Sequence, residues 1–421
     1  MYTMTNDIAT ECPQEDTAIR YNNKHINEER GPCPHAFDHV LFYVSSPRVV
    51  AQYLVCLFGF HIYAYKGLET GSREVSATAV KNGTAILVFM GAVRPLHREP
   101  LLPSIDSIHQ HIAEHGDSVK DVAFQCSDLE SLVLRIKSKR AEQLLISDEP
   151  VVVKDEYGTI KLITIRGVQD TVHTLVDRSD YRGFLPGFRL VEQLRPQGNV
   201  HENLIVEIDH CVQNEDWNQM YNVCQFYKDY LDFHVFWCVD ERQVHTEYSA
   251  LKSTVMASKN EIIKMPINEP AIGRRKSQIE EFVEFHNGPG VQHIALKTND
   301  MIETIGYMRT HGVEFIDVPD KYYENLKKRL ALEKHPILKE PLEVLKKHGI
   351  LVDFDEKGYL LQLFTKSIFE RPTFFFEIIQ RYNHNGFGAG NFKGLFEVME
   401  KDQEKRGNLT KQEISKGKVL K

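Results

Sequence analysis

The chain has 421 residues, of which 42% are hydrophobic and 26% charged, a balance typical of globular proteins that excludes a collagenous or wholly disordered chain. At about 150 residues per domain, this length predicts two or three domains. Lysine and arginine total 51 against 59 acidic residues, a net charge of −8. Because no basic excess is available to bind a phosphate backbone, we expect no nucleic-acid partner.

The first 34 residues are polar and charged, and we expect them to form a mobile N-terminal segment. They contain no apolar stretch of the kind that a signal peptide needs. The most apolar stretches, 49–60 and 235–239, are shorter than the ~18 residues of a membrane span. The seven cysteines form no C-x-x-C pair, and their odd number is typical of reduced thiols. The sequence therefore predicts a cytoplasmic protein without a membrane partner.

The first half of the chain, residues 35–190, begins with a strand, an amphipathic helix and a second strand. Residues 37–65 read FDHVLFYVSSPRVVAQYLVCLFGFHIYAY. In this stretch the spacing of Val50, Tyr53, Leu54 and Leu57 predicts one buried helical face. Another strand and amphipathic helix follow at 119–144, joined by a Ser-Asp cap. The glycine turn in YGTIKLITIRG predicts a closing hairpin.

The second half, residues 200–400, repeats this plan. Residues 208–239 begin with the same apolar-Asp-His pattern, and Met220, Val223, Cys224 and Tyr227 have the spacing of one helical face. Residues 291–315 match the second strand and helix, and KGYLLQLFTKS matches the closing hairpin. Three pairs in the same order predict an α+β fold of duplicated βαβββ modules, two in each half, that pair into curved open sheets.

Two segments of the second half, and the end of the chain, lack a counterpart. Residues 317–349 are charged and helical by pattern, which indicates either a surface helical hairpin or a helix over the mouth of the fold. Residues 385–396 read NGFGAGNFKGLF. The glycines allow a hinge and the phenylalanines can cover a pocket, so we expect a lid rather than a flexible linker. Residues 405–421 form a polar tail.

A comparison of the two halves singles out a candidate metal site. In the second half, three aligned positions carry potential metal ligands: His210, His293 and Glu377. The corresponding residues of the first half are His39, Asp121 and Thr174, which do not form a complete ligand set. Two histidines and one carboxylate form a facial triad, which holds one face of an octahedral Fe(II) and leaves three positions for substrate and oxygen. A single histidine on a strand is more often a core residue, so the asymmetry between the halves is what indicates a metal.

Six phrases, in order along the chain, match a known family: PINEP (266–270), RKSQI (275–279), GPGVQHIAL (288–296), LLQLFTK (360–366), PTFFFEIIQR (372–381) and GFGAGNF (386–392). By these phrases the chain resembles the 4-hydroxyphenylpyruvate dioxygenase family over about residues 35–405, most densely in the second half. The resemblance implies a vicinal-oxygen-chelate, glyoxalase-like fold. Such a fold has two open β-barrels, with a metal site only in the C-terminal one.

The resemblance also implies site residues. One Fe(II) per subunit is bound by His210, His293 and Glu377. The pocket residues with a catalytic role are Gln278, Gln292, Gln362 and Phe375. Those that bind the substrate are Ser253, Asn268, Pro270, Phe364, Asn391, Phe392 and Leu395. Amide side chains hold a phenol or carboxylate without adding charge beside a metal, and phenylalanines enclose an aromatic ring.

The activity implied by the resemblance is the conversion of 4-hydroxyphenylpyruvate and O₂ to homogentisate and CO₂, in tyrosine and phenylalanine catabolism. It proceeds by oxidative decarboxylation, ring hydroxylation and side-chain migration, and the resemblance implies a homodimer. Two alternatives stay open: a hydroxymandelate synthase that hydroxylates the benzylic carbon of the same substrate, and a non-catalytic binding module of the same fold. By the resemblance, a bulky residue at Phe375 favours the dioxygenase over the synthase.

Overall fold

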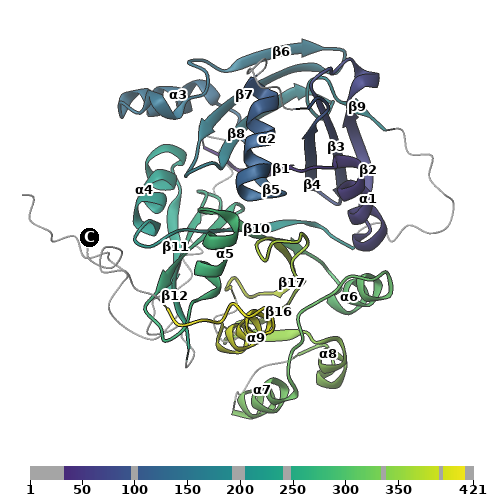
Figure 1. Ribbon diagram of the computed structural model, residues 1–421, viewed down its shortest axis with the longest axis vertical. Helices are drawn as coiled ribbons and strands as arrows, with labels where there is room; N and C mark the ends of the chain where they lie inside the picture. Colours follow the sequence, from purple (N-terminus) through teal and green to yellow (C-terminus); the bar gives the residue numbers. More distant parts are fainter. Residues whose placement is uncertain are drawn as a thin grey trace, which may run out of the picture.

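The computed structural model describes residues 33–95, 103–191, 204–239, 248–332, 338–387 and 392–412. These residues form two halves of like plan, which lie one above the other in Figure 1, each built on a curled sheet. Almost all of the predicted N-terminal segment 1–34, and the predicted tail beyond residue 412, lie outside the described residues.

The N-terminal half consists of two consecutive βαβββ modules joined by a helix. The elements of the first module are β1 (Ala36–Tyr43), α1 (Pro47–Phe58), β2 (His61–Lys66), β3 (Val75–Asn82) and β4 (Ala85–Ala92). Helix α2 (Pro103–His115) follows. The elements of the second module are β5 (Ser118–Gln125), α3 (Leu129–Ser138), β6 (Val151–Asp155), β7 (Gly158–Arg166) and β8 (Val172–Tyr181), and β9 (Arg189–Leu190) ends this half. The strands form one sheet in the order β6-β7-β8-β5-β1-β4-β3-β2-β9.

The C-terminal half repeats the two modules. Its first module contains β10 (Glu207–Asn214), α4 (Met220–Leu231), β11 (His234–Val239), β12 (Ala250–Ala257) and β13 (Lys264–Ala271), followed by α5 (Gln278–His286). Its second module contains β14 (Gly290–Lys297), α6 (Met301–Thr310), α7 (Asp320–Leu332), α8 (Leu342–His348), β15 (Leu351–Phe354), β16 (Tyr359–Phe364) and β17 (Phe375–Tyr382). Helix α9 (Phe392–Lys405) follows. The sheet order β11-β12-β13-β10-β14-β17-β16-β15 matches the N-terminal sheet strand for strand once β9 is left out, which confirms the predicted duplication.

The first strand of each half contains a β-bulge at the same place. Strand β10 pairs antiparallel with β14, but the register shifts between Ile208 and His210, so that Asp209 is the extra residue. In β1 the equivalent shift falls between Phe37 and His39. Because a bulge re-aims the side chains around the extra residue, Asp209 and His210 can face the same side of the strand.

The helical faces predicted from sequence pack against the sheets. In α1, Leu54 is fully buried, whereas Val50, Tyr53 and Leu57 are half-buried at the edge of the core. The same core extends across the two halves, because Phe42 of β1 packs edge-on against Phe374, with ring centroids 5.0 Å apart. The two curled sheets are therefore joined through a continuous apolar core.

The inserted segment 317–349 folds as the predicted surface helices α7 and α8 (Figure 1). The buried side chains of these helices include Tyr323 and Leu326 of α7 and Leu345 of α8. The Tyr322 hydroxyl donates to the backbone oxygen of Val352 at 3.1 Å and accepts from its N–H at 2.8 Å. The insertion thus packs against strand β15.

In the described part of the chain, no helix is both long enough and apolar enough to cross a membrane. Among the cysteines that the structure describes, those with free thiols are Cys33, Cys56, Cys126, Cys211 and Cys224. Cys238 is disulfide-bonded, so the prediction of reduced thiols is wrong at that position.

Candidate metal centre and adjoining pocket

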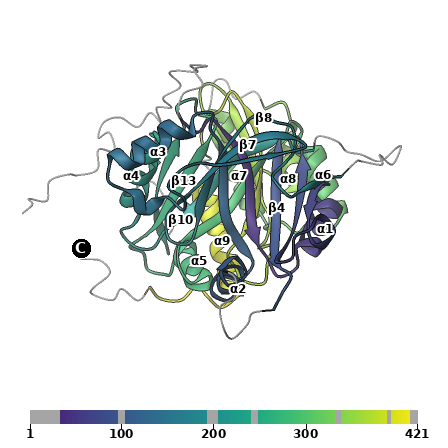
Figure 2. The same cartoon turned by 90° about the horizontal axis from the view of Figure 1, so that it is seen from above.

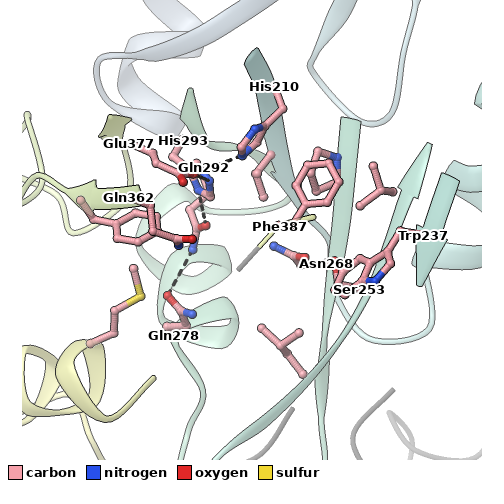
Figure 3. Close-up of a pocket in the computed structure, with 16 residues that line it drawn as sticks. His210, Trp237, Ser253, Asn268, Gln278, Gln292, His293, Gln362, Glu377 and Phe387 are labelled. Carbon is pink, nitrogen blue, oxygen red and sulfur yellow. Dashed lines mark hydrogen bonds and ion pairs between the residues drawn. The ribbon is translucent and has the colours of Figure 1, made fainter. Parts of the chain in front are cut away.

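The three predicted metal ligands lie together on three neighbouring strands of the C-terminal sheet. His210 is on β10, His293 on β14 and Glu377 on β17. Ala295 of β14 is paired with His210 on one side and with Glu377 on the other, so these side chains emerge on one face. His293, two residues before Ala295, shares that face. Figure 3 shows the three side chains pointing toward one another.

The ligand atoms of this cluster converge. Glu377 Oε2 lies 3.1 Å from His210 Nε2 and 3.4 Å from His293 Nε2. His210 and Glu377 are each 3% exposed and His293 is 9% exposed. Two imidazoles and one carboxylate therefore meet where water has little access, as the comparison of the two halves predicted.

The far nitrogen of each imidazole donates a hydrogen bond away from the cluster. His210 Nδ1 donates to Asp209 Oδ1 at 2.7 Å, and His293 Nδ1 donates to Gln292 Oε1 at 2.9 Å. Arg381 in turn donates to both oxygens of Asp209. With Nδ1 protonated in each ring, Nε2 presents its lone pair toward Glu377, which is the orientation that metal-binding histidines require.

The charges around the cluster favour a bound cation. Burial raises the pKa of Glu377, but His210 and His293 outweigh burial and bring that pKa down to about 2. Burial lowers the pKa of His210, yet Glu377 and Asp209 raise it above its ordinary value. Burial also lowers the pKa of His293. The ionised carboxylate thus attracts positive charge, either protons on the imidazoles or a metal ion that accepts nitrogen and oxygen donors.

The equivalent place in the N-terminal half retains the supporting residues and one histidine, but not the other two ligands. His39 Nδ1 donates to Asp38 Oδ1 at 2.7 Å, and Arg178 donates to both Asp38 oxygens at 2.6 and 2.7 Å. Asp121, however, accepts from the backbone N–H of Thr174 at 2.9 Å and from its hydroxyl. The first half therefore closes this position with a hydrogen bond where the second half presents a third ligand.

A pocket that the three ligands help to line lies beside them (Figure 3). Its polar lining consists of Ser253, Asn268, Gln278, Gln292 and Gln362. Its apolar lining consists of Val212, Trp237, Leu251, Val255, Pro266, Phe364, Phe387 and Met399. A cavity with aromatic and aliphatic walls and a few amide groups suits a small aromatic ligand with polar ends.

Six of the eleven pocket residues predicted from sequence line this cavity: Ser253, Asn268, Gln278, Gln292, Gln362 and Phe364. Pro270 is buried but is not part of the lining. Phe375 stacks on the His293 ring, with centroids 4.9 Å apart, and lines an adjoining cavity instead. Asn391 lies outside the described residues, and so do the side chains of Phe392 and Leu395.

Sequence reasoning missed several wall residues. Leu251 and Val255 flank Ser253 at a spacing of two on β12, and Pro266 precedes Asn268 by two on β13. Since every second residue of a strand faces the same side, this spacing is a signal that could have found them. Trp237 and Phe387 come from other segments. Their rings lie 5.9 Å apart, and the Phe387 ring packs edge-on against His210 at 5.1 Å.

The amide groups of the pocket differ in what they bind. Gln292 Nε2 is 3.5 Å from Gln278 Oε1, and Asn268 donates to Asn214 at 3.2 Å. Gln362 Oε1 is buried and has no hydrogen-bond partner among the described residues. A buried carbonyl oxygen without a donor is unfavourable, so Gln362 indicates a ligand that carries an O–H or N–H group.

None of the described residues of 317–349 lines the pocket, so the idea that this insertion covers the mouth of the fold gains no support.

Comparisons with known proteins agree with this geometry. Residues 208–363 match the Glyoxalase/Bleomycin resistance protein/Dioxygenase superfamily. The 4-hydroxyphenylpyruvate dioxygenase of Yarrowia lipolytica is 49% identical over 89% of this chain and 93% of that relative. The enzyme of the same name from Danio rerio is 46% identical over 93% of this chain and 96% of that relative.

Among solved structures, a mutant of 4-hydroxymandelate synthase from Streptomyces coelicolor aligns with a TM-score of 0.74 at 27% identity. The match covers 88% of this chain and 99% of that chain. A xylose isomerase-like TIM barrel/4-hydroxyphenylpyruvate dioxygenase fusion protein shares the fold, with a TM-score of 0.63 at 20% identity over 89% of this chain and 54% of that chain. Because the sequence relatives are far more similar than these structures and are covered almost completely, the chain belongs to the 4-hydroxyphenylpyruvate dioxygenase family.

Proposed function

We propose that this chain is a non-haem Fe(II) dioxygenase that converts 4-hydroxyphenylpyruvate and O₂ to homogentisate and CO₂. The observation that carries the proposal is the 43–49% identity to relatives of that name over nearly their whole length. The convergence of His210, His293 and Glu377 beside an aromatic-lined pocket supports it. The reaction belongs to tyrosine and phenylalanine catabolism.

The donor set fits a ferrous ion. Two imidazole Nε2 atoms and one carboxylate oxygen form the facial triad of non-haem iron oxygenases. Asp209 and Gln292 hold the two imidazoles in the ligating tautomer. An Fe(II) ion bound by His210, His293 and Glu377 supplies open coordination positions at which a 2-oxo acid and O₂ can react.

The other pocket residues bind and orient the substrate. The buried oxygen of Gln362 accepts from the ring hydroxyl, which gives it the missing donor. Ser253, Asn268, Gln278 and Gln292 provide further hydrogen bonds without placing charge beside the metal. Three rings of the apolar wall enclose the substrate ring and exclude water from the reacting carbon atoms. They are Trp237, Phe364 and Phe387.

Other elements of the proposal rest on the family resemblance. We assign Phe375 to the wall behind His293, where its ring holds the imidazole in place. Four further residues stay predicted contacts of the substrate: Pro270, Asn391, Phe392 and Leu395. Residues 385–396 stay a predicted lid. We also propose a cytoplasmic homodimer with domains at 35–190 and 200–400.

Product identification tests this function. Iron-loaded protein is incubated with 4-hydroxyphenylpyruvate, O₂ uptake is followed, and the products are separated. Homogentisate with one equivalent of CO₂ is the expected result, and Glu377→Ala is expected to abolish both uptake and product. Hydroxymandelate as the product would instead assign the chain to synthase chemistry, and an absence of O₂ uptake at full iron loading would favour a non-catalytic module.

A further inference from the structure

A second cluster of imidazole and carboxylate groups lies in the N-terminal half, apart from the pocket. His111 and His115 are one turn apart on α2, and Asp170 lies in the loop between β7 and β8. One ligand atom of each residue lies within 4.8 Å of the others. His111 and His115 are only 3% and 6% exposed. Helices α2 and α5 lie side by side at this point (Figure 2).

The ring of His115 has one nitrogen available to a cation. Its Nδ1 donates to the backbone oxygen of His286 at 2.7 Å. In the neutral ring, Nε2 therefore carries only a lone pair. That lone pair faces Asp170 Oδ2 at 3.6 Å and Glu114 Oε2 at 3.8 Å. Three potential acceptor atoms meet here, and either a proton on His115 Nε2 or a metal ion between them would offset their repulsion.

The other two residues can adopt the ligating state without a rearrangement of the chain. His111 Nδ1 lies 2.5 Å from Asp170 Oδ2, and His111 Nε2 lies 2.8 Å from the Ser118 hydroxyl. Because the Ser118 hydroxyl donates to the Gly116 oxygen at 3.3 Å, its oxygen can accept a hydrogen bond from His111 Nε2–H. Lys120 Nζ binds the other oxygen of Asp170 at 2.5 Å.

Each potential ligand thus has an outer partner that fixes its orientation. The outer partners are a backbone oxygen for His115, a hydroxyl for His111 and an ammonium group for Asp170. The same arrangement supports histidine and carboxylate ligands in metal sites generally.

We propose that His111, His115 and Asp170 form a second divalent metal site, separate from the iron centre. Imidazole and carboxylate donors suit Zn²⁺ or a similar ion, and four-coordinate structural sites of this kind need one more ligand. Glu114 Oε2 lies 3.8 Å from His115 Nε2 but is not part of the three-residue cluster, so this exposed side chain would have to move closer to provide the fourth ligand. A metal ion at this site would link α2 to the β7–β8 loop. The hydrogen bond from His115 to the backbone oxygen of His286 connects the same site to the end of α5.

A metal titration in a chain without the iron centre tests the proposal. The full-length His293→Ala/Glu377→Ala variant is stripped of metal and titrated with Co²⁺, whose visible absorption reports ligand geometry. One equivalent bound is the expected result, and adding His115→Gln or Asp170→Asn should remove it. His109→Gln is the matched control, because His109 is on the same helix but bonds to the Arg94 oxygen. Absence of binding in the double variant, or binding that survives His115→Gln, would overturn the site.

Thermal unfolding gives a second readout that does not depend on the iron-site variants. Zn²⁺ is added to iron-loaded protein, and the unfolding temperature is compared with and without the ion. The wild type and His109→Gln should both shift upward, whereas Asp170→Asn and His115→Gln should show no shift. Equal shifts in all four proteins would mean that the ion binds elsewhere and that the cluster holds protons only. Neither the metal titration nor the thermal unfolding measures turnover, so their outcomes are independent of the proposed dioxygenase activity.

Discussion

Arg381 donates two parallel hydrogen bonds to Asp209, Nε to Oδ2 and Nη2 to Oδ1, both at 2.7 Å. Such a bidentate pair fixes the carboxylate in plane and in position. Asp209 then orients His210, the first of the proposed iron ligands. Arg178 and Asp38 form the same pair in the N-terminal half, where no ligand set follows. The pair is therefore a property of the repeated module, and the proposed metal centre is built upon it.

Asp209→Asn is expected to weaken metal binding about 10- to 100-fold, because the amide loses the ionic pairing with Arg381 and no longer favours protonation of His210 Nδ1. The measurement is a metal titration of the stripped protein, with turnover at saturating metal as a second readout. Asp38→Asn makes the same chemical change beside His39 and should leave metal affinity unchanged. Equal losses in the two variants would show a general effect on folding instead.

Gln292→Leu is expected to lower metal affinity about tenfold or more, because His293 Nδ1 loses its acceptor. Gln292→Glu keeps an acceptor and should retain most of the affinity. Gln278→Leu is the control. Gln278 accepts from Gln292 Nε2, whereas His293 Nδ1 donates to Gln292 Oε1, so this variant should raise KM with metal affinity intact. A metal affinity that is equal in all three variants would contradict the role of Gln292.

Phe387→Leu is expected to raise KM for 4-hydroxyphenylpyruvate roughly tenfold, since about 1–2 kcal/mol of apolar contact with the substrate ring is lost. Steady-state kinetics at saturating O₂ provide the measurement. Phe184→Leu is the matched control, because Phe184 packs edge-on against His39 at 5.4 Å just as Phe387 packs against His210. That control should lower stability while leaving KM unchanged, and a KM effect of the same size there would refute the assignment.

Glu215 predicts a pH dependence of folding. It is fully buried, and burial raises its pKa from 4.5 to about 8. Between these pH values the folded chain keeps a proton that the unfolded chain releases, so the free energy of unfolding falls as pH rises and levels off above about pH 8. Glu215→Gln should remove this fall, with a difference from the wild type of up to about 4 kcal/mol at high pH. Denaturant unfolding from pH 5 to 9 measures it, and parallel curves for the two proteins would exclude the effect.

Much of the fold and the ligand set follows from the sequence, because duplicated segments can be compared with each other. Asp121 and Thr174 differ from His293 and Glu377, and that difference alone predicts a metal centre in the second half. Strand alternation likewise predicts which residues share a face. It does not predict which segments become neighbours, so the contact between Trp237 and Phe387 is seen only in the structure.

Two other features also depend on tertiary packing. Phe375 is two residues before Glu377 on β17, and alternation places both on one face, yet its ring stacks behind His293 and lines the adjoining cavity. Helices α7 and α8 can be predicted from their sequence pattern. The hydrogen bonds between Tyr322 and Val352 that attach them to β15 cannot be predicted in this way. Contacts between distant segments carry no local periodic signal.

The extra residue at Asp209 makes the length of strand β10 as important as its composition. Ile208 and His210 already pair with the adjacent residues Leu296 and Ala295, so deletion of Asp209 would close the bulge without changing the register of the strand. His210 would keep its place on β10 but lose the carboxylate that orients its ring. The proposed metal centre therefore depends on the insertion of one residue into a strand, and β1 carries the same insertion at Asp38 without a complete ligand set beside it.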